Sequence, residues 1–252
     1  MLQWQLLAFK RLWKANLTSS LVQPLLYMLG LGVGVGALVD RNTASGAALG
    51  AASYVAFVAP GLLVTTAMAL CAGESMWPIK GGLVWDRSYH AIASTPLDAH
   101  DIVGGHAVWM IVRSGIAAGA VAIVLACFTQ TRSWGLVPAV LVCALVGLAF
   151  ALPIMAYSVT AKTDGSFAAV QRFVIIPLFL FGGAFYPLSQ LPVVVQWVAR
   201  VFPLWHGVVV ARGFTLGGVG WAATAQHLGY IALWVVVGGV VATWRLTKVL
   251  YT

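Results

Sequence analysis

Residues 133–161 read SWGLVPAVLVCALVGLAFALPIMAYSVTA and contain no charged side chain. Nearly every position is apolar, so a helix formed here has no polar face to turn toward water. A helix needs about 20 consecutive apolar residues to cross the hydrocarbon core of a bilayer. Inside a bilayer the backbone must also satisfy its own hydrogen bonds, and a helix does so. The stretch therefore predicts a membrane-spanning helix.

The composition of the whole chain agrees with this prediction. Of 252 residues, 61% are hydrophobic and only 8% are charged. A soluble domain carries about 45–50% apolar and about 25% charged residues. These values exclude a water-soluble globular enzyme and a disordered protein. We therefore expect an all-α integral membrane protein, with residues 1–252 forming a single transmembrane domain.

Charge-free stretches elsewhere in the chain predict six transmembrane helices. A further apolar segment, residues 189–212, is interrupted by prolines and arginines, which suits short re-entrant helices in the outer leaflet better than one span. We place the six spans near residues 17–38, 55–76, 107–127, 136–159, 173–188 and 226–245.

The N-terminal residues 1–16 predict an amphipathic helix lying in the inner membrane interface. Leu2, Leu6, Phe9 and Trp13 recur at helical spacing, and the lysines lie on another face. The alternative is a plain extension of the first span.

Basic residues indicate the orientation, because cytoplasmic segments carry an excess of Lys and Arg. The net charge of +8 therefore suits an anionic inner leaflet, and we expect no nucleic-acid partner. We predict a multi-pass protein of a prokaryotic inner membrane with both termini in the cytoplasm. The inner segments would carry Lys10, Arg11, Lys14, Lys80, Arg87, Lys162, Arg172, Arg245 and Lys248, and the outer segments Arg41, Arg132, Arg200 and Arg212.

The sequence carries no motif for catalysis, metal binding or ATP binding. It contains no G-x-x-x-x-G-K-[ST] loop, no H-E-x-x-H and no G-x-S-x-G. No two histidines stand three or four residues apart, so we expect no metal site. The cysteines also lack ligand spacing, and we interpret them as packing residues. The histidines are His90, His100, His106, His206 and His227, and the cysteines are Cys71, Cys127 and Cys143.

Glu74 and Arg113 are the exceptions to the absence of charge within the spans. They could pair with each other or reach toward water at the inner end of the membrane. A chain of intramembrane charged groups is typical of an ion-coupled carrier, and two residues do not form one. A gradient-driven carrier or channel therefore remains the alternative function.

The polar loop at residues 77–106 predicts a docking surface for a soluble partner. Asp86 and Arg87 precede a short amphipathic stretch, residues 89–93, which ends at Ser94-Thr95-Pro96. The alternative is an ordinary solvated connection.

The run from Pro177 to Pro187, PLFLFGGAFYP, predicts a broken helix. Proline removes a backbone donor, and the glycine pair allows helix termination or close approach. An interrupted helix at membrane depth survives where protein or a cavity satisfies its backbone. The run therefore lines an interface or a pathway, or is simply a kinked packing helix.

Taken together, these motifs resemble those of ABC-2 type export permeases, nearest the branch of nodulation protein J lipooligosaccharide exporters and daunorubicin-type drug exporters. The resemblance covers nearly the whole chain, and the order and spacing of its motifs carry it. They are YVAFVAPG at residues 54–61, the loop at 86–96, the run at 177–187, and FPLWH at 202–206 followed by Arg212. Phe181 departs from a common form of the family, in which Ser precedes Gly182.

The resemblance implies a permease without a nucleotide-binding domain of its own. It implies two copies of an ATP-binding subunit, which would bind the ATP and magnesium, and a second permease chain, expected to form a homodimer. No cofactor is expected on this chain, which would move a hydrophobic or amphiphilic substrate, such as a lipid, glycolipid or drug, through surrounding membrane lipid. The implied coupling residues are Asp86, Arg87, Tyr89, His90, Ser94, Thr95 and Pro96; the implied pathway or re-entrant residues are Pro177, Phe181, Gly182, Gly183, Phe185, Tyr186, Pro187 and Pro203.

Overall fold

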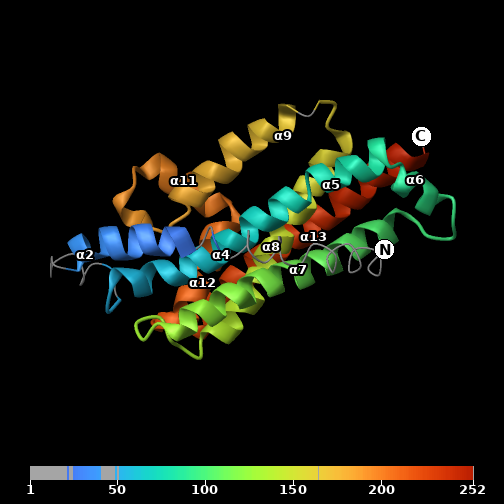
Figure 1. The fold of residues 1–252 in the computed structure, drawn as a ribbon. Helices are drawn as coiled ribbons and strands as arrows, with labels where there is room; N and C mark the ends of the chain where they lie inside the picture. The colour runs from blue at the N-terminus through green and yellow to red at the C-terminus, as the bar shows by residue number, and fades with distance from the viewer. Residues whose placement is uncertain (1–21, 23–24, 41–48, 50, 164, 252) are drawn as a thin grey trace.

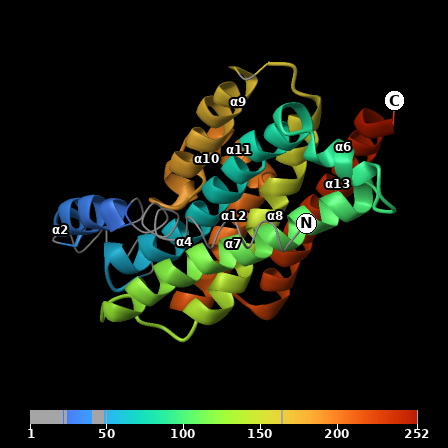
Figure 2. The ribbon, with the colours of Figure 1, turned by 45° about the vertical axis from the view of Figure 1, so that its right-hand side comes forward.

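The computed structural model describes residues 22, 25–40, 49, 51–163 and 165–251, and its described part is helical with no strand. The predicted all-α architecture is therefore confirmed. The long helices run side by side along one axis in both ribbon views (Figures 1 and 2), so the molecule is an elongated bundle. Shorter helices, α9 to α11, lie along one flank of that bundle.

Four helical segments among the described residues are long and apolar enough to cross a membrane. The first is a composite of α4, α5 and the π-helix η2, and together these run from Tyr54 to Trp85. The bounds are α4 Tyr54–Glu74, α5 Trp77–Lys80, η2 Gly81–Trp85, α7 Ala99–Cys127, α8 Leu136–Thr160 and α13 Trp221–Tyr251.

Short elements complete the described fold. Before α4 lie the π-helix η1 and α2, and between α5–η2 and α7 lies α6. The remaining short elements connect α8 to α13. Their bounds are η1 Met28–Val35, α2 Gly36–Val39, α6 Ser88–Ala93, α9 Gly165–Val170, η3 Gln171–Ile175, α10 Ile176–Phe181, η4 Leu188–Gln190, α11 Val193–Val201 and α12 Pro203–Leu216.

Local capping explains where several helices begin. Ser53 accepts a hydrogen bond from the Ala56 N–H at the start of α4. Asp98 and Asp101 form a reciprocal capping box at the start of α7. Both caps satisfy backbone donors that the first helical turn leaves unpaired. Pro203 begins α12, where its missing N–H costs no helical hydrogen bond.

Helix α8 is the centre of the core, because it packs against α4, α7, α12 and α13. Gly147 lets α4 approach closely: a Cβ atom there would lie 2.7 Å from the sulfur of Cys71. Cys71 and Cys143 are buried, as their interpretation as packing residues predicts, whereas Cys127 is exposed at the end of α7. The outward faces of α7 and α13 carry exposed aliphatic side chains, which suits contact with lipid.

The predicted spans near 55–76, 107–127, 136–159 and 226–245 correspond to the four long segments. A fifth is present only if α11 and α12 are taken together, and these helices are bent by 86° at a short break. The described residues thus contain four to five candidate spans, and the predicted count of six is not confirmed. The predicted interface helix at 1–16 and much of the predicted span at 17–38 lie outside the described residues.

Two predicted boundaries differ from the structure. The helix expected at 173–188 begins at Gly165 and ends at Phe181, because Gly183 adopts a left-handed backbone conformation with φ of 83°. The first long segment also continues to Trp85, α7 begins at Ala99, and α6 lies between them. The loop expected at 77–106 is therefore confined to residues 86–98.

Candidate functional site

The loop between η2 and α7 presents most of the predicted coupling residues to solvent. Asp86 ends η2, with its N–H bonded to the carbonyl of Gly81. Arg87 follows with φ of 50°, a left-handed conformation that is unusual for a side-chain-bearing residue. This turn leads the chain from η2 into α6. The exposed members of the predicted set are Asp86, Arg87, His90, Ser94, Thr95 and Pro96.

Tyr89 differs from the other predicted coupling residues because its side chain is buried. Its ring packs over Gly82, where a Cβ atom would lie 3.0 Å from the ring. Burial raises the pKa of the Tyr89 phenol above its ordinary value, so the ring stays uncharged at physiological pH. Tyr89 therefore anchors α6 to η2, while its neighbours face outward.

Basic residues join the helix ends on the same side of the bundle. The Lys80 ammonium donates to the carbonyl of Ala161 just beyond α8. Arg245 on α13 donates to the carbonyl of Ala156 and, at 3.0 Å, to the hydroxyl of Thr160. These contacts hold the ends of α5, α8 and α13 together beside the α6 loop.

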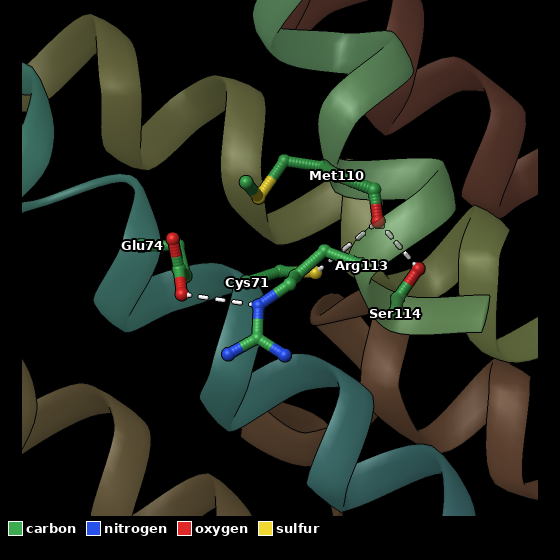
Figure 3. A network of polar contacts seen from close by, with 5 residues as sticks. All are labelled: Cys71, Glu74, Met110, Arg113 and Ser114. Carbon is green, nitrogen blue, oxygen red and sulfur yellow. Dashed lines mark hydrogen bonds and ion pairs between the residues drawn. The ribbon is translucent and has the colours of Figure 1, made fainter. Parts of the chain in front are cut away.

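Glu74 and Arg113 form an ion pair between α4 and α7, as one of the two predicted arrangements requires (Figure 3). Arg113 Nε lies 3.3 Å from Glu74 Oε1, and their side chains are 4% and 29% exposed. Nearby, Ser114 Oγ donates to the Met110 carbonyl at 2.6 Å, and the Cys71 sulfur faces that same carbonyl. The charges neutralise each other within the α4–α7 contact.

At the other end of α4, the predicted broken helix forms a tight turn. The chain leaves α10 at Gly182 and passes close to α4, where a Cβ atom on Gly61 would lie 2.7 Å from Ala184 Cα. Phe185 is buried, and its ring lies 5.3 Å from that of Phe179. Tyr186 and Pro187 are half-buried beyond it. The turn is thus built into the core.

Arg212 on α12 fastens this turn to α4, a role that the sequence analysis missed. Its Nε donates to the carbonyl of Phe57 at 3.0 Å, and Nη2 donates to the carbonyl of Ala184 at 2.6 Å. The guanidinium also lies 3.6 Å from the centre of the Phe57 ring, a favourable cation–π distance. We call the contact of α4, residues 182–187 and α12 through Arg212 the outer junction, after the orientation that the sequence predicts.

The remaining predicted pathway residues are Pro177, Phe181 and Pro203. Pro203 is buried at the start of α12. Pro177 and Phe181 line an apolar cavity of about 240 Å³ between η3–α10 and α11. The structure therefore places Gly182, Gly183 and Phe185 in the turn of the outer junction, and Pro177 and Phe181 at the cavity.

The structure also brings together two histidines that are far apart in sequence. His206 on α12 and His227 on α13 have their Nδ1 atoms 2.7 Å apart. The sequence analysis missed this pair because it searched for helical spacing, and the two helices meet only through tertiary packing. The described residues contain no group of three or more His, Cys, Asp or Glu side chains that could hold a metal ion.

Residues 1–216 match the family described as ABC-2 type transporter. The chain belongs to the ABC-2 type transporter family. It is 33% identical over 231 residues to nodulation protein J of Rhizobium leguminosarum bv. trifolii, covering 92% of this chain and 85% of that protein. It is 28% identical over 219 residues to the inner membrane transport permease YadH of Escherichia coli K12, covering 84% and 78%. The comparison with solved structures gave no match.

Membership of this family agrees with the apolar helices of the fold. The chain is a transmembrane ABC-2 permease, and proteins of this family are the membrane subunits of ABC transporters. The family therefore implies a partnership with an ATP-binding subunit. The resemblance recognised from the sequence motifs is confirmed.

Proposed function

We propose that the chain is the permease of an ATP-driven exporter, moving a hydrophobic or amphiphilic substrate out of the cytoplasm or the inner leaflet. The observation that carries this proposal is the continuous segment Tyr54–Trp85. One end carries the exposed loop at Asp86 and Arg87, and the other end carries Phe57 in the outer junction. A displacement of the loop by a bound partner can thus reach the outer junction along one helical unit.

The proposed assembly contains two ATP-binding subunits and two copies of this chain. ATP and magnesium would be bound by the ATP-binding subunits, while the α6 loop supplies the docking surface. The basic residues beside that loop, including Lys80 and Arg245, support a cytoplasmic location of this end, since basic segments favour the cytoplasm. Both chain termini would then be cytoplasmic. The name of the Escherichia coli relative supports an inner-membrane location.

A pull-down tests the proposed partnership. The tagged chain is purified from its native membrane in gentle detergent, and the bound proteins are identified and quantified by mass spectrometry. We expect one ATP-binding-cassette subunit for each copy of this chain. Recovery of the folded chain without such a subunit, in several detergents, would contradict the proposal.

Removing the charges of Asp86 and Arg87 tests the coupling role. We expect Asp86→Asn with Arg87→Gln to reduce export at least tenfold while ATP hydrolysis and membrane insertion continue, because the docking surface loses two of its charges. Export into vesicles and phosphate release are measured together on the reconstituted complex. Lys162→Gln is the matched control, because Lys162 is exposed beyond α8, outside the α6 loop. Unchanged export in the double variant would remove the coupling role.

The alternative function, a gradient-driven carrier, predicts a different pattern. Transport would then depend on Glu74 and Arg113 and would survive ATP depletion. Their mutual pairing at 3.3 Å favours a structural role, because a carrier needs an ionisable group that gains and loses its partner during transport. Transport that continues without ATP but stops in Glu74→Gln would favour the carrier.

A further inference from the structure

A cluster of rings joins the corner between α11 and α12 to the outer part of α13. His206 and His227 meet through their Nδ1 atoms at 2.7 Å. Tyr230 stacks on His206 with ring centres 4.1 Å apart, and its hydroxyl donates to the carbonyl of Val201 at 2.6 Å. Trp205 meets both imidazoles edge-on, at 4.9 and 5.3 Å. We call this group the histidine cluster.

The hydrogen bonds define which nitrogens carry protons. His206 Nε2 lies 2.9 Å from the carbonyl oxygen of Arg200. A carbonyl only accepts hydrogen bonds, so Nε2 of His206 must carry a proton. Nδ1 of neutral His206 is then an acceptor, and Nδ1 of His227 must donate to it. Nε2 of neutral His227 is consequently the site without a proton.

This arrangement accepts one proton and resists a second. The first can add to Nε2 of His227, which leaves the hydrogen bond between the Nδ1 atoms intact and makes it charge-assisted. A second must add to Nδ1 of His206. Two N–H groups then face each other across 2.7 Å, between two positive rings, and the contact cannot persist.

Among the residues that the structure describes, no carboxylate near the pair would stabilise its doubly protonated form. From α11 the nearby charged group is Arg200, whose guanidinium lies 5.8 Å from the Trp205 ring. From α13, the titratable group that faces the pair besides His227 is Tyr230. The remaining helices packed against α12 place their tyrosines elsewhere, Tyr54 of α4 beside Arg212 and Tyr157 of α8 on Phe167. Neither histidine belongs to a three-residue cluster with a carboxylate among the described residues.

We propose that the histidine cluster is a proton-sensitive contact, closed near neutral pH and released by acid, which controls whether the α11–α12 corner stays fixed to α13. Both imidazoles are half-buried, so the pair is not sealed inside the core of the bundle. The assignment to protons of the outer side rests on the proposed orientation. The corner is also linked to the outer junction through α12, because this helix carries both His206 and Arg212. Acid on that side would therefore loosen the outer end of the permease.

Proton linkage gives the size of the effect. The closed contact binds at most one proton, whereas two separated histidines bind two below about pH 6.5. The ratio of released to closed molecules therefore rises by up to tenfold for each pH unit below that value. Between pH 7.5 and pH 5.0 we expect the ratio of released to closed molecules to rise about tenfold or more.

Spin-label distances test this inference without measuring transport. Labels are placed at Val193→Cys on α11 and Leu233→Cys on α13, both exposed positions, after Cys127→Ser removes the exposed native thiol. The labelled chain is purified with its bound subunits and reconstituted in lipid nanodiscs. Double electron–electron resonance at pH 7.5 and pH 5.0 should give a longer, broader distance distribution at the lower pH. Because the readout is a distance, it is independent of whether the chain exports a substrate.

Two variants separate the histidines from other titrating groups. His227→Asn keeps an N–H donor near the Nδ1 position but does not titrate, so its distribution should be the same at both pH values. His206→Gln keeps the donor to Arg200 but removes the Nδ1 acceptor, so at pH 7.5 it should match the wild type at pH 5.0. An unchanged wild-type distribution at pH 5.0 overturns the proposal. A full acid response in either variant overturns it as well.

Discussion

At the scale of single residues, the charged side chains of this permease are held by specific partners rather than left in the apolar bundle. Arg113 is almost fully buried, and Glu74 neutralises it across the α4–α7 contact. Arg212 is instead held by two carbonyl groups and the Phe57 ring. A buried cation without such partners would be costly, so each arginine fixes the position of the segment it contacts.

Breaking the ion pair from one side should therefore destabilise the bundle. We expect Glu74→Gln to lower the free energy of unfolding by about 2–3 kcal/mol, because it leaves a buried guanidinium without its counter-charge. The double variant Glu74→Gln with Arg113→Met should recover much of this loss, since the buried guanidinium is removed as well. Thermal unfolding in one detergent measures both. Equal losses in the single and double variants would mean that packing, not charge pairing, dominates here.

At the scale of elements, the outer junction depends on backbone segments that pass unusually close together. Residues 182–187 fit against α4 only because position 61 has no side chain. Replacement by alanine would place a methyl group against backbone atoms of Ala184, which cannot rotate away. The junction therefore depends on Gly61 as directly as it depends on Arg212.

Two alanine substitutions in the same helix test this dependence. Gly61→Ala should lower the free energy of unfolding by about 1–3 kcal/mol, because overpacking forces α4 and the turn apart. Gly73→Ala is the matched control, since no described atom lies within 4 Å of its added Cβ. It should be neutral or stabilising by up to about 1 kcal/mol, as expected from helix propensity. Similar melting temperatures for the two variants would show that the turn moves to make room.

The same elements show what the sequence could and could not predict. The long helices could be predicted from charge-free apolar runs, because insertion into a membrane depends on the local composition and length of the chain. The end of α10 was misplaced by several residues, because proline and glycine mark a break without fixing where it occurs. Arg212 reaches Phe57 across 155 positions, and His206 meets His227 across the turn between α12 and α13. Such contacts arise from tertiary packing, so residue spacing carries no signal for them.

At the scale of the whole molecule, one helical unit connects the two candidate functional regions. The segment Tyr54–Trp85 has 32 residues, which corresponds to roughly 45–50 Å at 1.5 Å per residue. One end of this segment meets the α6 loop through Tyr89, and the other end meets Arg212. Rigid helices with defined contacts at both ends can carry a displacement over such distances, provided that the contacts have two arrangements.

Tyr89 tests whether the displacement passes through this unit. Tyr89→Ala removes the ring that packs on Gly82 and should reduce the substrate exported per ATP hydrolysed about tenfold, because α6 could move without moving η2. Tyr89→Phe keeps the ring and should stay within about twofold of the wild type, since no described residue bonds to the phenol hydroxyl. Export and ATP hydrolysis are measured on the same reconstituted complex. If Tyr89→Ala lowered export and ATP hydrolysis together, α6 would be needed for assembly of the complex and not for transmitting motion. If it changed neither rate, the motion of the ATP-binding subunit would enter the bundle by another contact.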